Sequence, residues 1–432
     1  MKFYSLNEKA PAVNFDEAVI RGIAPDKGLY FPEEIIPLQA EFFENIENYS
    51  NNEIAFEAIK QFTTGVIPDE KVKEIIADVL SFDFPLVELE ENVATLELFH
   101  GPTMAFKDVG ARFMARCLGY FSAEAKQKEN VTVLVATSGD TGGAVARGFL
   151  NVEGVQVIIL YPTGKVSDVQ EKQLTTLGAN ITALEVDGVF DDCQAMVKLA
   201  FLDNEITDHR KLTSANSINI ARWLPQMFYF LFAYKQAKRK GKELVFSVPS
   251  GNFGNICAGI VAHKLGMPVK HFVASVNEND IVPEYLKTGK YTPKPSVATI
   301  SNAMDVGDPS NFIRIQKLFD NDFEALSRKL SSFSYSDADT KTAMKSLYSE
   351  TGYVADPHGA VGYLGLKYYQ KENPDCYGIF LETAHPVKFL PVVEPVLNFT
   401  LEIPEQIKEV LDKEKVAHQI SDYEQFKNFL TK

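Results

Sequence analysis

The sequence predicts an α/β protein whose sheets are mostly parallel and are flanked by helices. Short β-rich runs alternate with helical segments through much of the chain, and these runs are continuously apolar, which is typical of strands buried on both faces. A chain of 432 residues is long for a single hydrophobic core, so we expect two lobes in one compact molecule. Hydrophobic residues at 45% and charged residues at 23% match ordinary globular usage.

Residues 1 to about 95 form an expected N-terminal extension. The stretches 53–62 and 69–80 have the apolar spacing of helices, and no clear β-α alternation accompanies them.

The first lobe is expected over residues 96–240. Helical segments between its β-rich runs are long enough to cross over from one parallel strand to the next. The predicted strands are 131–137, 155–161 and 181–186, and the predicted crossover segments are 144–152 and 167–179.

The second lobe is expected over residues 241–432. Its predicted strands are 243–249, 270–276 and 377–382. Between about 280 and 373 the strands give way to Pro- and Ser-bearing segments and polar helices, which indicates an insertion.

The charge balance bears on the partners of the protein. Subtracting 58 acidic from 43 basic residues gives a net charge of −15, which disfavours binding to nucleic acid or to anionic membranes. Any anionic substrate must therefore be captured by a local site. The most apolar run, 227–234, is far shorter than the roughly 20 residues of a membrane span and predicts a buried core helix.

The cysteines and the N-terminus predict a cytoplasmic protein. Four cysteines are scattered without metal-ligand spacing, so we expect neither a metal site nor a disulfide framework. The opening MKFYSLNEKAP has no apolar stretch of signal-peptide length, which argues against export.

Three turns at predicted strand ends are the places to search for a ligand, because open parallel sheets bind ligands beyond the carboxyl ends of their strands. The turns are Ser138–Gly143, Ser250–Asn255 and Glu382–Pro386. Glycines let the backbone approach an anion, and the N–H groups of a following helix favour phosphate. Each turn alone is weak evidence for a ligand site, since Gly, Ser and Asn are also ordinary turn and cap residues. Walker A and GxGxxG patterns are absent, which removes support for nucleotide hydrolysis and dinucleotide binding.

Lys107 is a candidate nucleophile. It precedes the helical stretch 109–121, and the positive end of a helix dipole disfavours an ammonium, so we expect its pKa to be lowered. A neutral lysine amine is suited to imine formation with an aldehyde. The alternative is an ordinary solvated surface lysine.

Five motifs, in the same order along the chain, resemble those of the threonine synthase family. Its members are pyridoxal-phosphate enzymes of the tryptophan-synthase β type (fold type II). The motifs are FHGPTMAFKD, ATSGDTGG, SANSINIARW, VPSGNFGN and ETAHPVKF, and the opening segment resembles the N-terminal region of the long form. The resemblance spans nearly the whole chain. It implies conversion of O-phospho-L-homoserine and water to L-threonine and phosphate.

The resemblance also implies roles for individual residues. Lys107 would hold pyridoxal 5'-phosphate as a Schiff base, and Thr383 would face the pyridine nitrogen. The alternative for Thr383 is that it only caps a helix that starts near Pro386. The wider fold type usually places Asn where this chain has Asp140, so whether Asp140 contacts the cofactor is left open. The residues that would cradle the cofactor phosphate are Gly251, Asn252, Phe253, Gly254 and Asn255.

The substrate contacts follow from the same motifs. Hydroxyls of Ser138 and Thr141 would bind the substrate carboxylate, while Asn216, Ser217 and Arg222 match the family's site for the substrate phosphate. Arg222 offers a planar donor fork suited to an oxyanion, and the alternative is a surface arginine paired with a carboxylate.

Two competing functions stay open from the sequence. A serine or threonine dehydratase, or a cysteine-synthase-like β-replacement enzyme, would share the lysine and the glycine loop but not the substrate-phosphate residues. A non-catalytic relative that binds the cofactor is the other. We expect a monomer or a homodimer.

Overall fold

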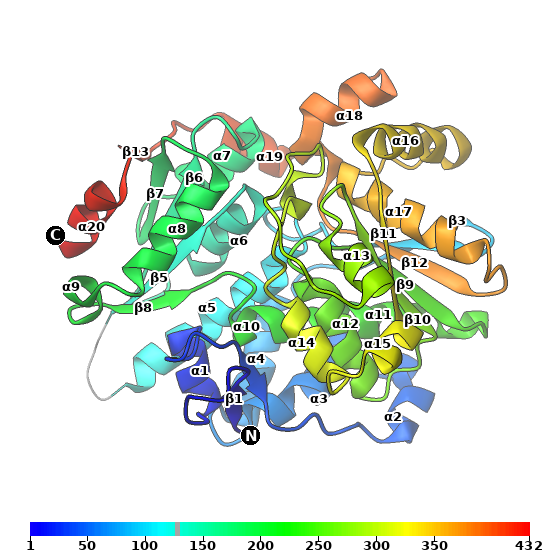
Figure 1. Ribbon diagram of the computed structural model, residues 1–432, viewed down its shortest axis with the longest axis horizontal. Helices are drawn as coiled ribbons and strands as arrows, with labels where there is room; N and C mark the ends of the chain where they lie inside the picture. Colours follow the sequence, from blue (N-terminus) through cyan, green and yellow to red (C-terminus); the bar gives the residue numbers. More distant parts are fainter. Residues whose placement is uncertain (126–129) are drawn as a thin grey trace.

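The computed structural model describes residues 1–125 and 130–432, which build two sheets side by side with helices around them (Figure 1). Strand order in the first sheet is β13-β7-β6-β5-β8, and every neighbouring pair is parallel. Its strands are β5 (Val131–Ala136), β6 (Val155–Pro162), β7 (Ile181–Val186), β8 (Lys211–Ser214) and β13 (His418–Ile420).

The second sheet has the order β11-β10-β9-β12-β4-β3, in which only β3 and β4 pair antiparallel. Its strands are β3 (Leu86–Glu90), β4 (Val93–Glu97), β9 (Leu244–Pro249), β10 (His271–Val276), β11 (Leu330–Ser334) and β12 (Tyr377–Glu382). The predicted α/β class with mostly parallel sheets is therefore confirmed, and so are the six predicted strands.

Sheet membership does not follow the chain order of the expected lobes. Strand β4 lies in the sheet of β9–β12, and β13 returns to the sheet of β5–β8, so where the lobes divide stays a prediction. The segment 280–373 also holds β11, which the sequence did not predict. Most of β11 is only partly buried and three of its five residues are serines, so its apolar signal is weak.

Helices cover the sheets and fill the space between them. The helices expected within residues 1 to about 95 are present as α3 and α4 and lie below the sheets in Figure 1, whereas the last part of this segment forms β3 and most of β4 in the second sheet. The α-helices are α1 (Phe15–Arg21), α2 (Ala40–Glu44), α3 (Asn51–Thr63), α4 (Asp69–Val79), α5 (Lys107–Glu124), α6 (Asp140–Phe149), α7 (Asp168–Thr175), α8 (Phe190–Ala200), α9 (Asn204–Thr207), α10 (Ile220–Trp223), α11 (Met227–Ala237), α12 (Gly254–Lys264), α13 (Ile281–Thr288), α14 (Phe312–Leu318), α15 (Phe323–Lys329), α16 (Asp337–Thr351), α17 (Pro357–Gln370), α18 (Leu390–Leu397), α19 (Glu405–Leu411) and α20 (Tyr423–Thr431).

The largest buried apolar cluster extends from the N-terminal residues through strands of both sheets, and α11 and α12 pack against each other within it. Residues 227–234 of α11 are all buried, so the predicted core helix is confirmed. Within the described part of the chain, no helix is long and apolar enough to cross a membrane. A short antiparallel pair, β1 (Phe3–Ser5) with β2 (Tyr30–Pro32), ties the two ends of the first N-terminal segment together.

Candidate active site

The thirteen predicted site residues all line one cavity of about 950 Å³. They reach it from the carboxyl ends of β5, β9 and β12, from the start of α5 and from the segment before and within α10. Residues 21–29 also contribute to the wall. Although the chain is strongly acidic, cations outnumber carboxylates along the lining, as needed to capture an anion locally. The lining cations are Arg21, Lys27, Lys107, Lys198, Arg222 and Lys294, and the carboxylates are Asp140, Asp191, Asp305 and Asp308.

Lys107 begins α5, and its side chain is only 17% exposed. Its Nζ lies 3.9 Å from Oδ2 of Asp140. Burial lowers the pKa of Lys107, and the nearby cations Lys388 and Arg222 lower it further, while Asp140 opposes them. The predicted direction is confirmed, but burial is the main cause. The alternative of a solvated surface lysine is wrong.

Asp140 is the first residue of α6 and is 4% exposed. One carboxylate oxygen, Oδ1, accepts from Nζ of Lys388 at 2.7 Å and from Nε2 of Gln170 at 2.9 Å. Burial alone would raise the pKa of Asp140, but Lys388 and Lys107 together bring it well below its ordinary range. The carboxylate is therefore ionised at neutral pH.

The turn after β9 has the features of an anion cradle. A Cβ on Gly251 would lie 2.7 Å from Cα of Met304, so only glycine fits there. Phe253 has a φ of 60° and turns the chain into α12, which begins at Gly254. Both polar atoms of the Asn255 side chain are buried and lack a partner among the described residues. An amide buried in this way calls for a ligand, and phosphate at a helix start supplies one.

Ser217 connects the two predicted phosphate-binding groups. Its Oγ accepts from Nδ2 of Asn252 at 3.1 Å and from Nδ2 of Asn311 at 3.0 Å. The hydroxyl hydrogen is then free to point to a further acceptor. Asn216, by contrast, donates from Nδ2 to the carbonyl of Ala136 at 3.1 Å, at the end of β5.

Arg222 lies in the short helix α10 and is 3% exposed. It donates from Nη1 to the carbonyl of Ala215, and its Nε has no partner among the described residues. Burial lowers the pKa of Arg222 to about 10. The alternative of a surface arginine is wrong, because the guanidinium is buried at the cavity wall.

Thr383 follows β12 and is 7% exposed. Its carbonyl accepts from the N–H of Phe106 at 2.8 Å, so the strand end is fixed next to Lys107. The alternative role of Thr383 as a helix cap is wrong, since His385 caps the 3-10 helix Pro386–Phe389 by accepting from the N–H of Val387. Ser138 and Thr141 are half-buried and also line the cavity.

Two buried residues near the cavity were missed by sequence reasoning. His358 lines the cavity, with Nδ1 3.1 Å from Oδ2 of Asp356, and its Nε2 accepts from the N–H of Ala303 at 3.2 Å. Arg314 is fully buried and donates to the carbonyls of Ser217 and Ile218. Neither lies in a strand-end motif, so no local signal marked them.

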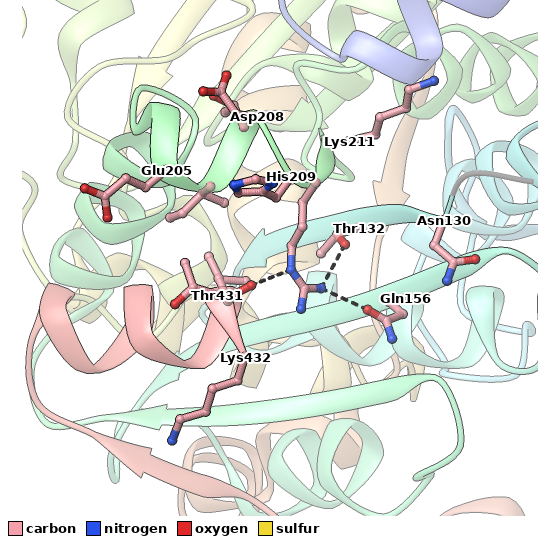
Figure 2. Close-up of a pocket in the computed structure, with 13 residues that line it drawn as sticks. Asn130, Thr132, Gln156, Glu205, Asp208, His209, Lys211, Thr431 and Lys432 are labelled. Carbon is pink, nitrogen blue, oxygen red and sulfur yellow. Dashed lines mark hydrogen bonds between the residues drawn. The ribbon is translucent and has the colours of Figure 1, made fainter.

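A second cavity, of about 730 Å³, lies near the C-terminal helix (Figure 2). None of the predicted site residues lines it. Its Arg210 donates to Gln156 at 3.1 Å, to Thr132 at 3.5 Å and to the carbonyl of Leu430, so two of the three guanidinium nitrogens are bonded within the protein. In the described ranges, no group of three His, Cys, Asp or Glu residues could hold a metal ion.

Comparison with known proteins identifies three family models along the chain. The model described as "Pyridoxal-phosphate dependent enzyme" matches residues 84–375. "Threonine synthase N terminus" matches residues 2–80, and "Threonine synthase, C-terminal" matches residues 359–430.

Individual relatives agree with these models over their full lengths. Threonine synthase of Buchnera aphidicola subsp. Baizongia pistaciae is 43% identical, covering 100% of this chain and 99% of the relative. The crystal structure of threonine synthase from Escherichia coli superposes with a TM-score of 0.93 at 41% identity, over 100% of this chain and 99% of that one. The structure of PLP-bound threonine synthase from Brucella melitensis gives 0.91 at 32% identity, with 100% and 99% covered.

More distant structures share the fold alone. Threonine deaminase isoform 2 from Solanum lycopersicum is 17% identical with a TM-score of 0.55, covering 78% of this chain and 96% of that chain. Full-length identity above 40% and the three matched models leave one assignment: the chain belongs to the threonine synthase family of pyridoxal-phosphate-dependent enzymes.

Proposed function

We propose that this protein converts O-phospho-L-homoserine and water to L-threonine and phosphate. The observation that carries the proposal is the meeting of all five family motifs at one cavity, which includes a buried lysine, a glycine-rich anion cradle and a buried arginine. Relatives named threonine synthase share 41–44% of their residues with this chain.

Three groups of residues would hold pyridoxal 5'-phosphate. Lys107 would carry it as an imine, the turn Gly251–Asn255 would bind its phosphate, and the hydroxyl of Thr383 would face its pyridine nitrogen. Bound pyridoxal phosphate supplies an electron sink for the substrate's Cα. Two observations support this assignment: the amide of Asn255 has no partner in the described part of the chain, and the backbone approaches closely at Gly251.

Other residues of the cavity lining would orient the substrate. Arg222 and Asn216 would hold its phosphate, while Ser138 and Thr141 would bind its carboxylate. Ser217 already accepts hydrogen bonds from Asn252 and Asn311, so its own hydrogen can be donated to an oxygen of the substrate phosphate or of the cofactor phosphate. Burial strengthens the contact of Arg222, because water does not compete for its donors.

Lys107 would move the protons. Its neutral amine, favoured by burial, would take a proton from Cα and later a proton from Cβ. Phosphate would leave Cγ, and the proton taken from Cβ would pass to Cγ, which becomes the methyl group. The hydroxyl of water would add at Cβ, the other proton of that water would go to the departed phosphate, and a proton would return to Cα. His385 is not free for this role, because its Nδ1 caps a helix.

An assay of purified protein with O-phosphohomoserine tests the reaction. We expect phosphate release together with threonine formation at equal rates. A dehydratase or β-replacement enzyme would instead act on serine, threonine or O-acetylserine without releasing phosphate. Yellow protein that is inactive on all of these substrates would indicate a non-catalytic cofactor-binding relative.

Borohydride reduction followed by peptide mapping tests the lysine. We expect the modified peptide to contain Lys107, and we expect Lys107→Ala to lose both the imine and turnover. Lys165→Ala is the matched control, since Lys165 is exposed and does not line the cavity. Modification of any other lysine would contradict the assignment.

We also propose that the enzyme acts in the cytoplasm as a monomer or a homodimer. All four cysteines are buried free thiols, which suits a reducing compartment. Light scattering coupled to size exclusion measures the assembly directly, and a mass above that of two chains would contradict the proposal.

A further inference from the structure

Lys388 is a buried lysine for which the reaction described above has no use. It lies in the 3-10 helix Pro386–Phe389 and its side chain is 0% exposed. It does not line the cavity. Its Nζ contacts Oδ1 of Asp140 at 2.7 Å and donates to the carbonyl of Thr103 at 2.9 Å. A lysine is almost never buried this fully unless it is paired.

The two oxygens of Asp140 face different partners. Oδ1 is taken by Lys388 and Gln170, whereas Oδ2 points to Lys107 at 3.9 Å. The carboxylate therefore stands between two buried lysines. Gln170 in turn packs against Gly139, where an added Cβ would lie 2.4 Å from its amide, so the position of the carboxylate is tightly defined.

Four charged groups act on Lys107 from the surrounding elements. They are Asp140 from α6, Lys388 from the segment after β12, Arg222 from α10 and Asp356 at the start of α17. Without Lys388, a buried and unneutralised carboxylate would lie next to Lys107 and hold its nitrogen protonated. A protonated amine cannot accept the proton from Cα.

We propose that Lys388 is a positioning residue that neutralises Asp140 and fixes it beside Lys107, so that the pair presents no net charge to the lysine nitrogen. The inference rests on the proposed function, in which Lys107 carries the cofactor.

Three variants of the holoenzyme test the charge balance: Lys388→Met, Asp140→Asn and the double variant. The measurement is the pH midpoint of the imine absorbance between pH 5 and 11. Lys388→Met should raise the midpoint and Asp140→Asn should lower it. The midpoints of these two variants should differ by about 1–3 pH units, the range expected for a charge at this separation. The double variant should return close to the wild-type value. Lys408→Met is the control for the loss of one positive charge, because Lys408 is an exposed lysine on α19 that pairs with Glu405.

Thermal unfolding of the same proteins separates this role from a purely structural one. A structural salt bridge would lower the melting temperature of each single variant and restore it in the double, with all midpoints unchanged, and that outcome overturns the inference. If Lys388→Met does not fold, Asp140→Asn and the double variant must still differ in the stated direction. Peptide mapping of the reduced wild type distinguishes the two proposals: label on another lysine removes both, whereas label on Lys107 with unmoved midpoints removes only this one.

Discussion

At the scale of single residues, burial decides what the polar groups of the cavity can do. Lys107 and Arg222 are both removed from water, and each has a lowered pKa for that reason first. For the lysine, burial favours the neutral amine that reacts with an aldehyde. The arginine stays charged at neutral pH, since its pKa is still about 10, and its Nε has no partner among the residues that the structure describes.

Arg222→Lys should weaken use of O-phosphohomoserine more than it weakens cofactor retention. A point charge cannot reproduce the two-pronged contact of a guanidinium with an oxyanion. The expected loss is about 1.5–3 kcal/mol for each charge-assisted hydrogen bond, measured as the change in kcat/KM. Cofactor content is determined on the same preparation, and cofactor loss with an unchanged kcat/KM would place Arg222 elsewhere.

Thr383→Asp should still bind the cofactor but make threonine slowly, by about ten-fold or more, which corresponds to roughly 1.4 kcal/mol. A carboxylate would keep the pyridine nitrogen protonated, whereas a hydroxyl is a neutral partner. A long-wavelength absorbing species should accumulate after mixing with substrate, as rapid-scanning spectroscopy can detect. Thr383→Ser keeps the hydroxyl and is the control. Wild-type spectra in the Asp variant would remove Thr383 from the site.

At the scale of elements, the strand ends bring the site together. The turns after β5, β9 and β12 were predicted from the sequence because each combines an apolar run with a glycine or hydroxyl motif. Short or polar strands gave no such signal: β13 has only three residues, two of them exposed, and β8 has four. Their pairing depends on neighbouring strands that lie far away in the chain.

Gly251→Ala should weaken cofactor binding by roughly ten-fold or more, in line with the 1–3 kcal/mol cost of forcing an extra methyl into a packed site. The added Cβ would lie 2.8 Å from the carbonyl oxygen of Ala303 and closer still to Met304, which must move away from the cradle. Cofactor titration followed by absorbance measures the affinity.

Gly119→Ala in α5 is the control, since its Cβ would meet only a methyl of Val152 at 3.1 Å. Equal cofactor affinity of the two variants would show that the turn has room to spare and does not cradle the phosphate.

At the scale of the whole molecule, buried carboxylates make stability depend on pH. Glu382 at the end of β12 is 0% exposed, and its Oε2 has no partner among the described residues. Its Oε1 accepts from the N–H of Asp356 at 2.6 Å. Burial raises the pKa of Glu382 well above its ordinary value, and the nearby carboxylate of Asp356 raises it further. The folded protein therefore favours the protonated acid.

The consequence is a loss of stability as pH rises. Since the unfolded chain gives up this proton near its ordinary pKa, unfolding becomes easier from there up to the folded pKa, by about 1.4 kcal/mol per pH unit. Glu382→Gln should remove this slope. Urea unfolding of both proteins, followed upward from about pH 5, measures the difference in this slope, to which groups other than Glu382 contribute equally. Parallel curves for the two proteins would show that Glu382 is ionised in the folded state.

The sequence by itself determined the fold class, six of the strands, the core helix and the cluster of motif residues around Lys107. These follow from local patterns, since alternation of apolar runs and the chemistry of turns are visible within a few residues. Only the tertiary structure decided which residues surround that cluster. Lys388 beside Asp140, His358 beside Ala303 and the hydroxyl of Ser217 beside Asn252 are contacts between distant parts of the chain. Chain reversal and sheet pairing create such contacts, and burial at them sets the charge of each group, so no local pattern could have predicted them.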